Sequence, residues 1–70
     1  QQERRQKLYD AIERKRMQIF NLEQQISALQ FKMSGMRNQE YIDNMLRWID
    51  EKEAKIRELE MAIQDMERKL

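Results

Sequence analysis

The chain of 70 residues contains no cysteine, no histidine and no proline, and its single glycine is Gly35. Without cysteine, neither a disulfide framework nor a thiolate metal site is possible. Histidine and cysteine are also the side chains that most often act as general base, nucleophile or transition-metal ligand. No glycine-rich phosphate loop occurs in the sequence either. We therefore expect that the chain is not an enzyme and that it binds no metal and no other cofactor.

Long apolar runs are missing as well. No stretch approaches the roughly 20 apolar residues that a membrane-spanning helix needs, and no segment resembles a secretory signal. The 14 basic and 13 acidic residues give a net charge of +1, which excludes attraction to nucleic acid or membrane by overall charge. We expect a cytoplasmic location, with the nucleus as the alternative. Because the chain begins without Met and heptads reach both ends, we interpret it as a piece of a longer protein.

The composition that remains is typical of long helices, with 39% charged residues. Apolar residues recur at alternating intervals of three and four, which places a narrow apolar seam on one face of a helix and requires a second helix to cover it. The predicted coiled-coil seam is Leu8, Ile12, Ile19, Leu22, Ile26, Leu29, Met33, Ile42, Met45, Ile49, Ile56, Leu59, Ile63 and Met66.

The seam consists of two stripes that are out of phase, and Gly35 lies at their join. Continuing the first stripe past Met36 would bring Glu40 and Asp43 into the seam, whereas the apolar pattern restarts at Ile42. This offset of two residues is about 200° around a helix at roughly 100° per residue. One straight coiled coil therefore cannot use both stripes without a change at the centre.

We predict an all-α fold, an antiparallel coiled-coil helical hairpin that forms a single module over residues 1–70. The helices are expected at 3–34 and 39–70, with the reversal at 35–38. Gly35 is expected to end the first helix in the left-handed conformation, and Asn38 to cap the second. The alternative is one long helix that forms an antiparallel or a parallel coiled-coil dimer, because glycine inside a helix costs only about 1 kcal/mol.

Charge favours packing one half of the chain against the other. Residues 1–35 hold seven basic and four acidic side chains, whereas residues 36–70 hold seven basic and nine acidic ones. Lys15 and Lys52 interrupt the seam, and a polar seam residue can fix the register. The expected alignment pairs Leu8 with Ile63, Ile12 with Leu59, Ile19 with Lys52, Leu22 with Ile49 and Ile26 with Met45, with Arg16 near Glu53 and Glu60.

Several large apolar side chains fall outside the seam, where a plain two-stranded rod has no use for them. Met17, Phe20, Ala28 and Phe31 form a second stripe along the first helix. Aromatic residues and Met in such places are enriched in binding hot spots. The candidate partner surface is Met17, Phe20, Phe31, Tyr41, Leu46 and Trp48. The alternatives are that the last three close over the chain reversal as a small local core, or that a third helix covers them.

Two short basic runs form a second candidate site, made of Arg4, Arg5, Lys7, Arg14, Lys15 and Arg16. Clustered basic residues on a helix can bind the phosphates of a nucleic acid or an anionic membrane surface. Acidic residues are interleaved among them, however, so the alternative is a solvated face that complements the acidic second half of the chain.

These observations predict a structural coiled-coil interaction module inside a larger protein of cytoskeletal, motor or trafficking type. Its role would be oligomerisation, spacing or docking, including intramolecular regulation, and its partner another helix of the same chain, of a copy or of a different protein. The alternative function is nucleic-acid or anionic membrane-surface binding through the basic N-terminal helix.

Overall fold

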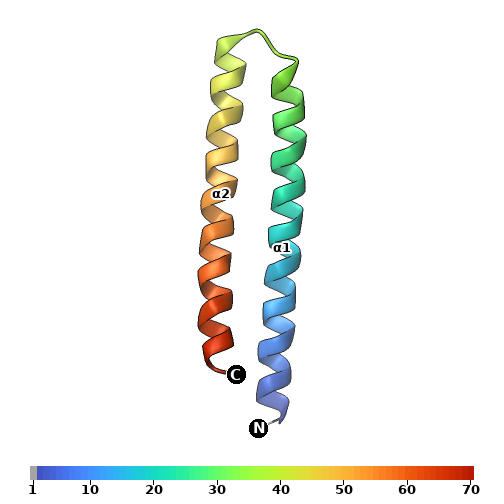
Figure 1. Ribbon diagram of the computed structural model, residues 1–70, viewed down its shortest axis with the longest axis vertical. Helices are drawn as coiled ribbons and strands as arrows, with labels where there is room; N and C mark the ends of the chain where they lie inside the picture. The colour runs from blue at the N-terminus through green and yellow to red at the C-terminus, as the bar shows by residue number, and fades with distance from the viewer. Residues whose placement is uncertain (1) are drawn as a thin grey trace.

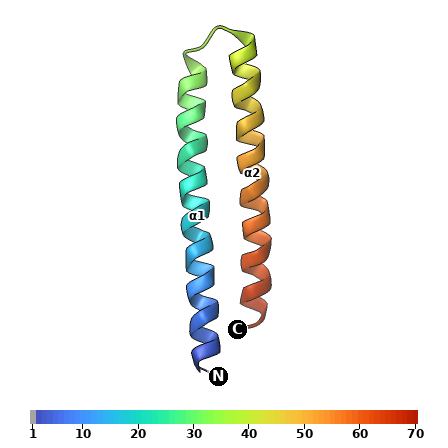
Figure 2. The same ribbon diagram turned by 180° about the vertical axis from the view of Figure 1, so that it is seen from behind.

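The structure is a computed structural model that describes residues 2–70, and it consists of two helices, α1 (Gln2–Ser34) and α2 (Gln39–Arg68). Figure 1 shows them side by side and antiparallel, with both chain ends at the same end of the rod. The view from behind shows the same arrangement (Figure 2). The Cα atoms extend over 56 × 15 × 10 Å. The predicted helical hairpin is confirmed, and the continuous-helix alternatives are not adopted.

The end of α1 differs from the expected left-handed glycine cap. The Gly35 N–H donates to the carbonyl of Lys32 at 3.3 Å, and the Met36 N–H donates to the carbonyl of Met33 at 3.1 Å. Bonds that span three residues tighten the last turn and satisfy carbonyls that the helix leaves free. No residue from 2 to 70 has a positive φ. The prediction of a left-handed Gly35 was therefore wrong, because the tightened turn makes that conformation unnecessary.

Asn38 begins α2, as predicted. Its backbone is extended, with φ −77° and ψ 116°, and its side-chain oxygen accepts the N–H groups of Glu40 at 2.9 Å and Tyr41 at 3.4 Å. An N-cap asparagine satisfies amide groups in the first turn that have no partner inside the helix. The carboxylate of Glu40 lies in the same turn, where the helix dipole favours an anion. The Asn38 side chain thus stabilises the start of α2, next to the chain reversal.

The core is a single line of side chains between the helices. Among residues 2–70 the buried apolar side chains are Ile12, Met45, Ile49, Leu59 and Ile63. The remaining predicted seam residues are half-buried: Leu8, Ile19, Leu22, Ile26, Leu29, Met33, Ile42, Ile56 and Met66. Each helix is covered by only one neighbour, so most seam side chains keep an edge in solvent. No helix in the described range is long and apolar enough to cross a membrane.

The helices pair one heptad further along α2 than the sequence alignment predicted. The Lys52 ammonium donates to the side-chain oxygen of Gln25 at 2.6 Å, and Leu8 lies beside Leu70 rather than opposite Ile63. Figure 1 agrees, because the N-terminal end of α1 projects beyond the end of α2. The a and d positions in this alignment pair Leu8 with Leu70, Ile12 with Met66, Ile19 with Leu59, Leu22 with Ile56, Leu29 with Ile49 and Met33 with Met45.

The physical reason is that a heptad pattern matches itself again after seven residues. A slide of one heptad keeps every a position facing a d position, so the seam alone does not distinguish the two alignments. The turn does, because residues 35–38 join the helices, as predicted, and α2 begins only at Gln39. The same slide changes the partner of Arg16, whose guanidinium is 3.1 Å from the carboxylate of Glu67. The expected neighbours of Arg16, Glu53 and Glu60, were therefore wrong.

The α1 cap makes a prediction about Gly35→Ala. A Cβ at this position would meet only the Lys32 carbonyl oxygen, at 3.9 Å, and the backbone is not left-handed. We expect the free energy of unfolding to rise by about 0.4–1 kcal/mol, because alanine restricts the unfolded chain more than glycine does. Urea denaturation at fixed protein concentration measures this change. A loss of stability would mean that the residue is left-handed in solution and that α1 ends in a different cap.

The α2 cap makes a second prediction. We expect Asn38→Ala to lower the free energy of unfolding by about 1 kcal/mol, because two amide groups lose their acceptor. Asn38→Asp is the matched control, since an aspartate at the N-cap accepts the same bonds and should leave the stability nearly unchanged. The same urea titration compares the three chains. Equal losses in both variants would contradict a capping role for the side-chain oxygen.

Candidate interaction surface

Both seam lysines are half-buried between the helices. The Lys52 ammonium reaches Gln25 of α1, and this hydrogen bond links the helices on the side of the rod where Trp48 lies. A lysine in a coiled-coil seam keeps its aliphatic stem among apolar neighbours while its charge reaches polar groups at the edge. Lys15 and Lys52 thus belong to the packing of the hairpin.

All six residues of the predicted partner surface are exposed in the structure. The exposed fractions are 84% for Phe31, 61% for Met17 and 59% for Phe20 on α1. On α2, Tyr41, Leu46 and Trp48 are exposed by 60%, 44% and 49%. The alternative in which these α2 residues close over the reversal as a local core is not what the hairpin adopts.

Two of the six share a pair of neighbours near the turn. A shallow hollow beside Phe31 is lined by Ala28, Leu29, Gln24 and Gly35 among others. A second hollow is lined by Ala28 and Leu29 together with Trp48 of α2, and by Gln25 and Lys52. Tyr41 and Leu46 line neither hollow. The structure therefore brings Phe31 and Trp48 to the two sides of Ala28 and Leu29.

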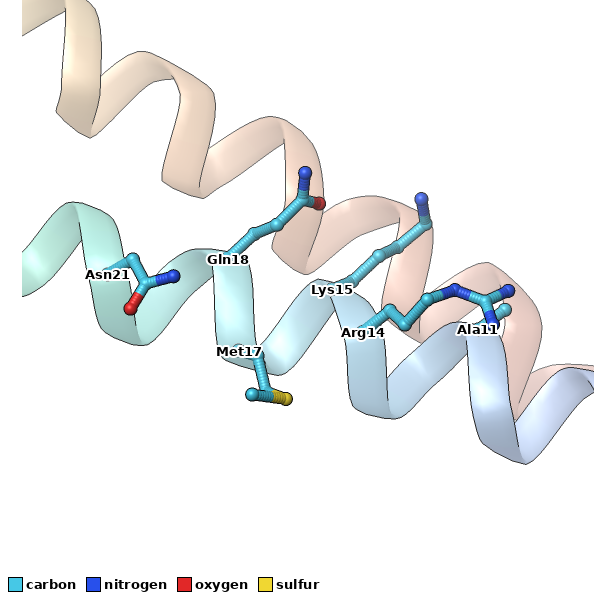
Figure 3. A pocket seen from close by; sticks show the side chains of 6 residues that line it. All are labelled: Ala11, Arg14, Lys15, Met17, Gln18 and Asn21. Atoms are coloured by element: carbon cyan, nitrogen blue, oxygen red, sulfur yellow. The ribbon is translucent and has the colours of Figure 1, made fainter.

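The other apolar residues of α1 continue from Phe31 along the side of the helix that does not contact α2. We define the α1 outer face as Met17, Phe20, Gln24, Ala28 and Phe31, all of which are exposed. Their intervals of three or four residues place them in one stripe. Figure 3 shows Met17 at one end of this stripe, with its side chain pointing away from α2. Between Met17 and Phe31, α1 is therefore apolar towards α2 and has exposed apolar side chains on the opposite side.

The α1 outer face contains no charge. From Met17 to Met36 the charged residues are Glu23 and Lys32 alone. Glu23 lines a different hollow, with Ile26, Ile56 and acidic residues of α2, and Lys32 borders the hollow beside Phe31. The sequence interpretation overlooked this scarcity of charged residues. It also left Gln24 out of the stripe. The consequence of this scarcity is that the centre of the stripe, around Gln24, can be covered without burying a charge.

The exposed side of α2 is different. Its exposed Met61, at 67%, is flanked by Glu58, Glu60 and Asp65 on neighbouring turns. A helix that is apolar on more than one side packs against more than one neighbour. By this criterion α1 has an exposed apolar side that a second neighbour could cover, whereas the side of α2 around Met61 is charged and solvated.

The basic residues do not form one surface. Arg4 and Arg5 lie in a hollow near the chain ends with Leu8, Lys69 and Leu70. Arg14 and Lys15 line a separate hollow with Met17, and Figure 3 shows the six residues around it. Arg16 bonds across to Glu67. Lys7 is exposed. The six predicted residues are thus divided between two hollows, one ion pair and solvent.

No group of three or more acidic side chains among residues 2–70 is placed to hold a metal ion. Comparison of the chain with protein-family models, with curated proteins and with solved structures finds no match. The geometry of the hairpin is accordingly the basis for any functional conclusion.

Proposed function

We propose that this chain is a protein-interaction module, a helical hairpin that presents the α1 outer face to another helix. The observation that carries the proposal is the difference between the two exposed sides of the rod. α1 exposes an uncharged stripe with Phe20 and Phe31, whereas the exposed Met61 on the side of α2 that faces away from α1 lies among charged residues. Aromatic and Met side chains are enriched at the centre of protein interfaces. The proposed role is binding, with no catalytic step.

The hairpin supports this role by holding the stripe rigid. α2 packs along α1 from Leu29 to Leu8, so the exposed side chains stand on a helix whose position is already fixed. Binding to a preformed helix avoids the entropy cost of ordering a disordered segment. In a longer protein of cytoskeletal, motor or trafficking type, such a module would act in oligomerisation, spacing or docking. It could equally hold another domain of its own chain.

A photo-crosslinking amino acid tests the proposal in cells that produce the chain. We expect a replacement at Phe31 to give discrete protein adducts, because this is the most exposed aromatic side chain of the α1 outer face. The matched control is the same replacement at Met61, which is also highly exposed but lies among charges on α2. Adducts from Met61 that equal those from Phe31, or no protein adduct at Phe31, would contradict the proposal. Nucleic-acid adducts from a replacement at Arg14 would instead support the alternative function.

A further inference from the structure

The hairpin exposes more surface than a folded monomer of its mass normally does. Its accessible area is 5991 Å², and its mass is 8.7 kDa. A monomeric protein of this mass is expected to expose about 4,700 Å², so the excess is roughly 1,250 Å². A stable interface removes about 800 Å² from each partner, and obligate dimers remove more. The excess is therefore of the size that one dimer interface would cover.

The α1 outer face has the symmetry that a contact between identical chains requires. A two-fold interface places the same patch against itself, so the patch must match when its direction is reversed. The five residues are spaced by three, four, four and three positions, and this series is the same in both directions from Gln24. An antiparallel copy places Met17 opposite Phe31 of the other copy and Phe20 opposite its Ala28. Phe20 thus meets a small side chain, and Phe31 meets the flexible side chain of Met17.

Polar groups do not oppose this pairing. Gln24 meets the same residue of the other copy on the two-fold axis, and two glutamine amides can donate to and accept from each other. Glu23 lies about 100° around the helix from Gln24, so its exposed carboxylate stays at the edge of the pairing and in solvent. The charged side of α2 remains outside the pair and in solvent.

We propose that two copies of this chain associate antiparallel through the α1 outer face, with the two α1 helices in the centre and an α2 helix on each outer side. This inference rests on the proposed interaction role and names its partner as a second copy. The four helices then lie in a row, in which each α1 packs against its own α2 on one side and against the other α1 on the opposite side. This arrangement also covers Phe20 and Phe31 of α1, which are exposed in the hairpin.

Sedimentation equilibrium of the purified chain tests association directly. We expect a dimer for the natural sequence and a monomer for Phe31→Glu, whose dissociation constant should rise by more than about 100-fold because each dimer contains the substitution twice. Met17→Glu should act in the same direction. Met61→Glu is the control and should remain dimeric, and circular dichroism should show equal helix content in all four chains. A monomeric natural chain, or a dimer that neither outer-face substitution weakens, would overturn the proposal.

The antiparallel arrangement has its own test, which the absence of native cysteine makes simple. In Gln24→Cys the two thiols face each other across the two-fold axis, so mild oxidation should link most of the protein into dimers. Ala54→Cys, on the exposed side of α2, should link much more slowly. Equal rates would overturn the predicted arrangement. A monomeric chain whose Phe31 position still captures a different protein in cells would reject self-pairing and leave the interaction role in place.

Discussion

A pair of helices can bury side chains only along the line where they touch, and the whole structure depends on that one seam. Five side chains are buried along it and the rest keep an edge in water. The ion pair between Arg16 and Glu67 adds little, because both groups are about half exposed and surface pairs contribute about 1 kcal/mol at most. The stability of the hairpin is therefore set by the fit of Ile, Leu and Met in one register. Small helical units of this kind commonly gain further stability by association.

Much of this architecture could be predicted from the residues. The two apolar stripes gave the seam, their change of phase at Gly35 gave the place of reversal, and Asn38 gave the start of α2. The register could not be obtained in this way, because each heptad resembles the next and Ile12 can face Leu59 or Met66 equally well. The conformation of Gly35 at the end of α1 could not be predicted either, since a glycine permits both a left-handed cap and a tightened last turn.

The exposed apolar residues could be predicted individually, but their grouping could not. Exposed Phe20 and Phe31 stood out because a two-stranded seam does not need them. Only the folded hairpin divides these exposed apolar residues into groups. Trp48 lies beside Ala28, whereas Leu46 lines neither of the two hollows near the turn. The informative feature of α1 is what it lacks, which is charge on the side opposite α2. One side of α1 packs against α2, and the exposed apolar side chains on its opposite side carry the proposed binding role.

The register of the seam is the central claim, and distances between spin labels test it most directly. The register places labels at Glu13 and Gln64 at nearly the same level along the rod, whereas Glu13 and Arg57 are displaced by about one heptad, or about 10 Å along the helix. All three positions are exposed. We predict a shorter distance for the first pair, unchanged when labelled chains are diluted with unlabelled ones. A shorter distance from Glu13 to Arg57, or a signal that disappears on dilution, would contradict the hairpin described here.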